Sequence, residues 1–289
     1  MMEILVAGEF YIDLVLSGFP NWPKAGEESL ARDFRREVGG GAAITAVGLA
    51  RLGNRVALAG IVGREDGAWV VERLASLGVD ASAVEFDETE PTGVTVAVSG
   101  PMDRALFTYP GANRRLASLL RRTPPQARHV HLACPANAET LAAFGGCSVS
   151  IDIGWHAAVP EALSVLRGVD LFFPNRAEGE RMTGKREPEA MLRAFERAGF
   201  RGVALKLGED GAVLLWQGEI LGAAAPNITP VDTTGAGDAF NAGFLHAWLR
   251  GGDPREWLAA GNFCGAMSTR ALGGIAGLPG AEEFACRSN

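Results

Sequence analysis

The chain has 289 residues, of which 47% are hydrophobic and 21% charged, which is typical of a globular protein and excludes a disordered or fibrous one. A net charge of −7 without a block of Lys or Arg disfavours a nucleic-acid partner. No apolar run approaches the ~18 residues of a membrane span, and the first residues lead straight into an apolar strand pattern, so we expect neither a membrane segment nor a secretory signal.

Short apolar runs alternate with helical patterns along most of the chain. The predicted strands cover residues 3–7, 55–62, 129–133, 149–153, 169–173, 202–207 and 212–216. Helical patterns at 42–52, 69–77 and 191–198 each end at a glycine, namely Gly53, Gly78 and Gly199. This alternation predicts a mainly parallel sheet with helices on both sides, in one domain covering residues 1–289.

Two segments interrupt the alternation, at about 10–38 and 86–109, where short strands and turns replace helices. Within the second, strands at 92–98 and 105–109 would form a hairpin across residues 100–103. Two such insertions in an α/β core predict a small β lid.

Four cysteines, Cys134, Cys147, Cys264 and Cys286, lie far apart without a CxxC spacing. Scattered thiols predict a reducing compartment, so we expect the protein to be cytoplasmic.

The residues at 231–240, Val-Asp-Thr-Thr-Gly-Ala-Gly-Asp-Ala-Phe, precede a predicted helix. The backbone amides of Gly235, Ala236 and Gly237 would form an anion site at the helix start. A carboxylate beside an anion site repels a phosphate unless it accepts a proton from an attacking hydroxyl, which makes Asp238 a candidate general base. The alternative is an ordinary helix start, capped by Thr234 or Asp238.

Earlier in the chain, the sequence Asn175-Arg176-Ala177-Glu178 follows an apolar strand, where open α/β sheets bind ligands. Oxygen ligands at this place suit Mg²⁺, held through water. The alternative is a capping box that only begins a helix.

The motif at 232–238 resembles the signature of the ribokinase-like (PfkB) carbohydrate kinases, and other stretches agree in order over nearly the whole chain. Asp13, Gly39-Gly40-Gly41 and Asn175 to Glu178 are similar to family motifs. So is the turn Lys206-Leu207-Gly208-Glu209-Asp210-Gly211, while Pro110-Gly111-Ala112-Asn113 resembles ribokinases in particular. The resemblance implies a three-layer α/β/α fold with a β lid, and an ATP-dependent kinase that phosphorylates a hydroxyl, most simply a primary one, on a sugar-like substrate.

The resemblance also assigns roles. Asp238 would be the base and Gly235, Ala236 and Gly237 the anion site. The substrate residues would be Asp13, Gly39, Gly40, Gly41 and Asn113, and the nucleotide residues Asn175, Lys206, Gly208, Gly211 and Asn262. Glu178 would hold Mg²⁺ through water, and Asp232 and Thr234 match positions that bind a monovalent cation in some members, with dependence on K⁺ left open. Relatives often dimerise through the lid.

Two of these roles have alternatives. Asp13 could be a surface turn residue, and Gly39 to Gly41 only a hinge between lid and core.

Two departures from the family pattern affect the substrate. Ile44 replaces an Asn that commonly contacts the sugar, and Ala133 stands where ribokinase has a carboxylate. Ribose is therefore a doubtful acceptor, and a less hydroxylated, larger or partly apolar one, such as a nucleoside or a modified sugar, fits better. A non-catalytic binding protein on the same fold is the alternative from another functional class.

Three other patterns are discounted. Residues 179–186 nearly match a P-loop, but Arg186 replaces the Ser or Thr that ligates Mg²⁺. No GxGxxG follows the first strand, so a Rossmann dehydrogenase lacks its fingerprint. We interpret His129 and His131, although near Cys134, as packed core rather than as metal ligands, and Trp248 and Trp257 as core as well.

Overall fold

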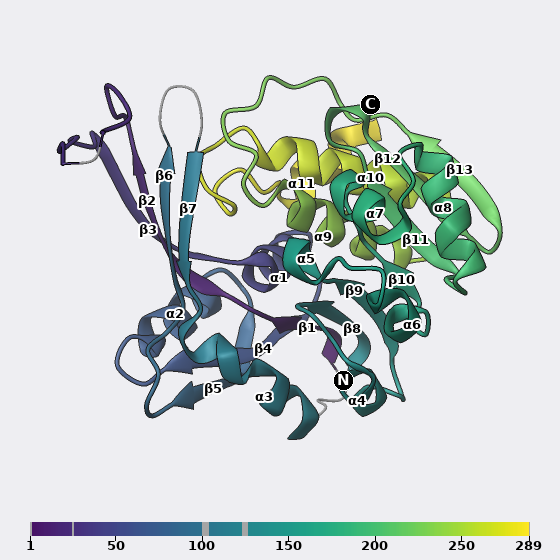
Figure 1. The fold of residues 1–289 in the computed structure, drawn as a ribbon, viewed down its shortest axis with the longest axis horizontal. Coiled ribbons are helices and arrows are strands. Elements are labelled where there is room, and N and C mark those ends of the chain that lie inside the picture. Colours follow the sequence, from purple (N-terminus) through teal and green to yellow (C-terminus); the bar gives the residue numbers. More distant parts are fainter. Residues whose placement is uncertain (1, 25, 100–103, 123–126, 289) are drawn as a thin grey trace.

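The computed structural model describes residues 2–24, 26–99, 104–122 and 127–288. In this part of the chain, a nine-stranded sheet has the order β13-β12-β11-β10-β9-β8-β1-β4-β5 (Figure 1). Its strands are β1 (Met2–Gly8), β4 (Val56–Gly63), β5 (Asp80–Asp87), β8 (Ala127–Ala133), β9 (Ser148–Asp152), β10 (Leu171–Phe172), β11 (Gly202–Lys206), β12 (Ala212–Trp216) and β13 (Glu219–Ala223). The strands from β5 to β11 pair in parallel, and β12 and β13 are antiparallel. The predicted mainly parallel sheet is confirmed.

Helices cover both faces of this sheet. Along β1, Ile4 and Val6 pack on one face, and Leu5 and Ala7 on the other, because side chains of a strand alternate. The first face is covered by α1 (Gly41–Arg51), α2 (Gly67–Ser76), α9 (Ala236–Trp248) and α10 (Pro254–Ser268). The second is covered by α3 (Leu116–Arg122), α6 (Ala162–Leu166), α7 (Arg176–Thr183) and α8 (Pro188–Arg197). The short helices α4 (Ala138–Ala143), α5 (Gly154–Ala157) and α11 (Ala281–Ala285) complete this three-layer fold.

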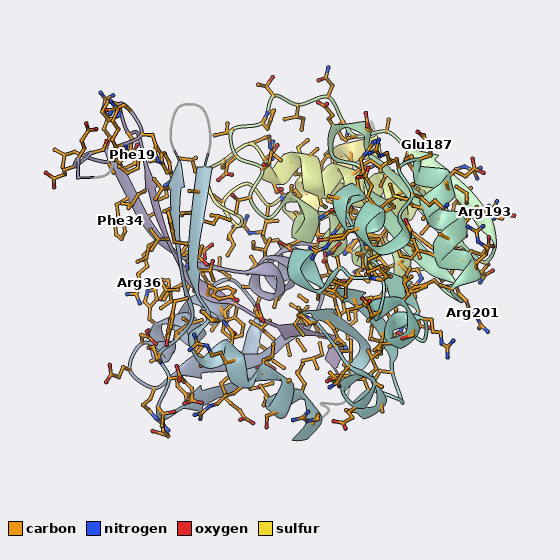
Figure 2. All side chains as sticks on the ribbon, viewed as in Figure 1. Phe19, Phe34, Arg36, Glu187, Arg193 and Arg201 are labelled. Carbon is orange, nitrogen blue, oxygen red and sulfur yellow. The ribbon has the colours of Figure 1, made fainter. Side chains whose placement is uncertain are left out.

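A four-stranded sheet of order β3-β2-β6-β7 projects from the α/β core, at the upper left of Figure 1. It consists of β2 (Tyr11–Ser17), β3 (Asp33–Gly39), β6 (Val94–Ser99) and β7 (Arg104–Tyr109), and we call it the lid. The predicted hairpin between β6 and β7 is confirmed, and its turn at 100–103 lies outside the described residues. Figure 2 shows Phe34 and Arg36 on the side of the lid away from the core.

Several details differ from the sequence prediction. Phe86 and Asp87 pair with Val62 and Gly63 in the large sheet, so the second lid segment begins at Val94 rather than at residue 86. Strands β5 and β13 were not predicted, since polar residues interrupt their apolar runs. The strand predicted at 169–173 shortens to β10, although Phe173 remains fully buried.

The discounted patterns have structural explanations. Gly179 to Thr183 belong to α7, so this near-P-loop is a helix rather than a phosphate-binding loop. His129 and His131 are fully buried and share Ser150 as a hydrogen-bond partner, each at 2.8 Å. Trp257 is buried, whereas Trp248 is partly buried against the core. No helix in the described ranges is both long and apolar enough to cross a bilayer.

Candidate active site

Asp238 lies in the first turn of α9. The N-cap of this helix is Gly235, whose φ of 72° is in the left-handed region that glycine adopts without strain, and no side chain caps the helix. The capping alternative is therefore wrong: Thr234 donates its hydroxyl to Asp232 instead, at 2.7 Å, and Asp238 is the third residue of the helix. The amide of Ala236 donates to the Thr233 carbonyl oxygen at 3.3 Å. The next amides of the helix start have no intrahelical acceptor, so this turn presents donors and a positive dipole end beside the Asp238 carboxylate.

The carboxyl group of Asp238 has an unusual protonation equilibrium. Burial of the group raises its pKa to about 7, with repulsion from Asp152 and Glu178 adding to the effect and the charge of Lys206 opposing it. The residue keeps partial contact with solvent. A carboxyl group that is half-ionised near neutral pH is well matched to accept a proton from an alcohol.

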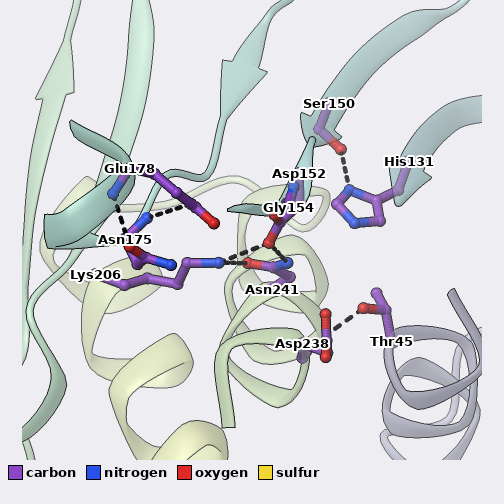
Figure 3. Close-up of polar contacts among 10 residues, drawn as sticks. All are labelled: Thr45, His131, Ser150, Asp152, Gly154, Asn175, Glu178, Lys206, Asp238 and Asn241. Carbon is purple, nitrogen blue, oxygen red and sulfur yellow. Dashed lines mark hydrogen bonds and ion pairs between the residues drawn. The ribbon is translucent and has the colours of Figure 1, made fainter. Parts of the chain in front are cut away.

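Lys206 connects three elements beneath this turn (Figure 3). Its Nζ lies 2.6 Å from Oδ2 of Asp152, at the end of β9, and 3.3 Å from Oδ1 of Asn241 in α9. Asn241 in turn donates to the same Asp152 oxygen at 2.8 Å. Lys206 and Asp152 are only 12% and 14% exposed, so this is a buried ion pair. A Cβ built on Gly237 would lie 3.3 Å from Nζ, which places the ammonium group directly against the glycine turn.

Sequence reasoning missed Asp152 and Asn241. Asp152 lies near the carboxyl end of the strand predicted at 149–153, and the rule that ligands bind at carboxyl ends of parallel strands could have found it. Asn241 follows Asp238 by three positions, which places both on one side of α9, and this spacing is readable once the helix is predicted.

Asn175 and Glu178 form the capping box that was the alternative interpretation. Glu178 N donates to Asn175 Oδ1, and Asn175 N donates to Glu178 Oε2, both at 2.9 Å. Glu178 is 4% exposed, and its pKa is raised by burial and by repulsion from Asp152. The capping box therefore fixes a buried carboxylate close to a second one.

A cavity of about 570 Å³ opens beside the glycine turn. Of the predicted nucleotide residues, Lys206, Gly208, Gly211 and Asn262 line it, and Asn175 does not. Asn262 is held by donating to the carbonyl oxygens of Ala223 and Ala224, at 2.8 and 3.2 Å. Ala236, Gly237 and Phe240 bring the start of α9 to the same cavity.

The glycines at 39–41 bring Asp13 close to the Asp238 site. A Cβ on Gly39 would overlap the Asp13 carboxylate, and a Cβ on Gly41 would lie 2.8 Å from Asp238 Oδ1. Gly40, with φ 86°, is the N-cap of α1. Asp13 belongs to the middle of β2, so the surface-turn alternative is wrong. Burial and the neighbouring Glu37 raise the pKa of Asp13 to about 7.

A second cavity of about 290 Å³ lies between the lid and the core, with Asp13, Gly273 and Gly274 among its lining residues. Gly274 adjoins the turn at 235–238, because a Cβ on Gly235 would lie 3.0 Å from the Cα of Gly274. This cavity therefore ends next to the start of α9.

The two departures from the family pattern leave apolar groups at this place. Ile44 is 3% exposed, and its Cδ1 would lie 2.7 Å from a Cβ on Gly235. A Cβ built on Gly41 would lie 3.8 Å from the Cβ of Ala133. Both apolar side chains adjoin the glycines around Asp238.

Asn113 lies at the base of the lid and is 4% exposed. Its Nδ2 donates to the Phe10 carbonyl oxygen at 2.9 Å, while its buried Oδ1 has no partner among the described residues. It lines neither of the two cavities. This geometry anchors the chain between β1 and β2, and a contact with substrate stays a prediction.

Asp232 organises the loop before α9. Its Oδ1 accepts from Thr234 N and Oγ1, and its Oδ2 accepts from Gly273 N at 2.8 Å. These hydrogen bonds join the segment just before the turn at 235–238 to the loop that lines the second cavity. The structure gives no test of the predicted monovalent cation.

Comparisons with known proteins agree with this geometry. The model of the pfkB family of carbohydrate kinases matches residues 1–281. The 2-dehydro-3-deoxygluconokinase of Bacillus subtilis is 30% identical over 87% of this chain and 86% of its own length. The ATP-dependent ribose-1-phosphate kinase of Halopiger xanaduensis is 32% identical over 93% and 92%. Among solved structures, the Arabidopsis thaliana ribokinase complexed with ribose and ATP superposes with a TM-score of 0.83, 26% identity and 99% coverage of both chains. The chain therefore belongs to the pfkB family of carbohydrate kinases, which transfer a phosphoryl group to an alcohol.

Proposed function

We propose that this protein transfers the γ-phosphoryl group of ATP to a hydroxyl, most simply a primary one, of a small sugar-like acceptor, with Asp238 as general base. The observation that carries the proposal is the Asp238 carboxyl group, whose pKa is raised to about 7 in the first turn of α9. A binding protein without turnover has no need of such a base beside an anion site.

The 570 Å³ cavity is proposed to hold ATP. Its volume suits a nucleotide-sized ligand, and its lining joins the glycine turn at 208–211 to the start of α9. In this arrangement the terminal phosphate would face the amides of Gly235, Ala236 and Gly237. The complex of the Arabidopsis relative with ribose and ATP supports ATP as the phosphoryl donor and a sugar-like molecule as the acceptor.

The donor set fits Mg²⁺. Among the described residues, no three His, Cys, Asp or Glu side chains form a metal-binding group, which excludes a protein cage there. Glu178 and Asp152 nevertheless repel each other in a buried place, and Mg²⁺ is commonly bound through one or two carboxylates, water and phosphate oxygens. Glu178 would therefore hold the ion through water. When bound, the ion neutralises charge on the phosphates.

The chain's own residues would carry out proton transfer and charge stabilisation during phosphoryl transfer. The acceptor hydroxyl loses its proton to Asp238, its oxygen forms a bond to the γ-phosphorus, and the bond from that phosphorus to the ADP oxygen breaks. The amides at the start of α9 stabilise negative charge on the phosphoryl oxygens, and Lys206 adds positive charge beneath the turn. Closure of the lid would exclude water, which competes as an acceptor.

The acceptor contacts differ from those expected for ribose. Ile44 and Ala133 offer no hydrogen bonds near Asp238, so a sugar loses two polar contacts there. Relatives of similar identity are named for different acceptors, ribose 1-phosphate and 2-dehydro-3-deoxygluconate. A nucleoside is the second candidate acceptor, because the loss of two polar contacts near Asp238 favours a partly apolar molecule.

The direct test measures ADP release across a panel of sugars, sugar acids, sugar phosphates and nucleosides, with Asp238→Asn as the control. We expect one acceptor class to give ADP release well above the variant, which should remain folded by circular dichroism. ADP release no higher than in the variant with every acceptor would reject the kinase and favour the binding protein.

We further propose a single domain that dimerises through the lid. Leu14, Leu16, Val96, Phe34 and Phe107 share the outer face of this sheet by register, and both Phe side chains are 61% exposed. Such an apolar sheet face is a self-complementary surface for a second copy of the chain.

We also propose that the protein works in the cytoplasm. All four cysteines, Cys134, Cys147, Cys264 and Cys286, are free thiols, in agreement with a reducing compartment.

A further inference from the structure

The lid strand β3 presents charged side chains to both of its faces. In an antiparallel pair, residues directly opposite each other point to the same side, and Asp13 lies opposite Glu37 while Val15 lies opposite Arg35. Arg35 therefore shares the face of Asp13 and is its diagonal neighbour, at a distance of roughly 7–8 Å between Cα atoms. Both residues line the second cavity.

The two other charged side chains of β3 at this cavity already have partners. Glu37 accepts two hydrogen bonds from Arg73, at 2.7 and 2.6 Å, in an ion pair. Arg36 points to the opposite face of β3, and its guanidinium group lies 4.0 Å from the centre of the Trp69 ring. No described residue forms an ion pair or hydrogen bond with Arg35. The guanidinium group of Arg35 thus reaches this cavity without a charged partner among the residues that the structure describes.

The residues that line the opposite end of the cavity, at 272–276, have no polar side chains. Gly274 adjoins Gly235 at the start of α9, where Ile44 replaces a polar contact. An acceptor that reaches from Asp238 to the lid has few hydrogen-bond partners at its reacting end. Its binding free energy must then come from groups remote from the reacting hydroxyl.

We infer that the acceptor carries an anionic group, a carboxylate or a phosphate, that binds Arg35 in the cavity between lid and core, while Asp13 binds a hydroxyl of the same molecule. Guanidinium groups bind both anions through paired hydrogen bonds, which also orient the ligand. The alternative is a solvated arginine on an exposed strand, and it predicts no effect of Arg35 on the choice of acceptor. The inference rests on the proposed kinase function and names the substrate class.

The test compares matched acceptors: a neutral aldose, the corresponding aldonic acid and the corresponding phosphate monoester. ADP release gives kcat/KM for wild type, Arg35→Gln and the control Arg32→Gln, an exposed residue that does not line the cavity. With the wild-type enzyme, we expect one anionic acceptor of a set to give a higher kcat/KM than its neutral counterpart. For that acceptor, Arg35→Gln should lower kcat/KM on the order of 10- to 100-fold, the loss of one charge-assisted contact, while the neutral aldose changes by less than about 2-fold. The aldonic acid and the phosphate monoester separate the two sources of the anion.

Three outcomes decide the question. Preference for the neutral aldose, or an equal effect of Arg35→Gln on neutral and anionic acceptors, overturns the inference while the kinase stands. If no acceptor gives more turnover with the wild type than with Asp238→Asn, the kinase function itself is rejected. In that case, isothermal titration calorimetry of the aldonic acids and phosphate monoesters decides: the anion site stands if wild type binds one of them more tightly than Arg35→Gln does, and it is overturned if the two affinities agree.

Discussion

Two carboxyl groups with the same raised pKa face the proposed acceptor site. The pKa of Asp238 and that of Asp13 are both about 7, mainly through burial. Each is proposed to act as a carboxylate, Asp238 by accepting a proton and Asp13 by accepting hydroxyl hydrogen bonds. Both are protonated and inactive below their pKa, so activity should be lost as the pH falls through 7.

This gives a prediction for the pH dependence of kcat/KM for the acceptor. The plot of log kcat/KM against pH should rise below pH 7 with a slope between 1 and 2, and level above it. Asp13→Asn should reduce the slope to 1. A profile that is flat between pH 5.5 and 8 would contradict the assigned roles.

Lys206 offers a second prediction at this scale. Lys206→Met leaves Asp152 buried without its ion pair, and we expect a loss of ~3 kcal/mol or more in the free energy of unfolding, measured with urea. Arg193→Met is the control, since its pair with Glu196 is exposed and should contribute less than about 1 kcal/mol. Equal losses in both variants would show that the buried pair has no special role.

At the scale of elements, the glycine stretch between β3 and α1 determines how closely the lid approaches the base. A Cβ on Gly41 would lie 2.8 Å from Asp238 Oδ1, so Gly41→Ala must displace one of the two. We expect kcat to fall on the order of 100-fold, because small displacements of reacting groups are costly. The affinity for ATP, measured by calorimetry, should change little.

The matched control is Gly168→Ala, where no described atom lies within 4 Å of the new Cβ. Its kinetics should equal those of wild type. A Gly41→Ala enzyme with unchanged kcat would mean that the Asp238 carboxylate is not held against this turn.

Elements also explain what could be predicted from the sequence. The turn at 235–238 is contiguous, so its glycines and Asp238 could be identified together. Asp152, Lys206 and Asn241 come from β9, β11 and α9, and only the order of strands in the sheet joins them. The contact of Asn113 with the Phe10 carbonyl could not be predicted either, because the two residues are 103 positions apart.

At the scale of the whole molecule, the lid and the core together line the cavity that we propose as the acceptor site. β2 and β3 supply Asp13 and Arg35, whereas α9 and the loop at 272–276 belong to the core. The lid was predictable as two interruptions of the α/β rhythm. Its start was not, because acidic residues interrupt the apolar pattern of β5, so Phe86 and Asp87 could not be recognised as the end of a strand of the large sheet.

The outer face of the lid gives a prediction on assembly. Phe107→Glu introduces a charge into the apolar sheet face, so we expect light scattering after size exclusion to show a shift from dimer to monomer. Leu30→Glu is the control, being 73% exposed outside the lid strands. A monomeric wild type would reject the proposed dimer.

The central claim concerns the Asp238 carboxylate, and single-turnover transfer from γ-labelled ATP to the preferred acceptor tests it most directly. Asp238→Asn is nearly isosteric and should keep the affinity for ATP, while the rate of transfer falls by roughly 10²–10⁴-fold. A variant that transfers the phosphoryl group within 10-fold of the wild-type rate, with ATP bound equally well, would contradict the account.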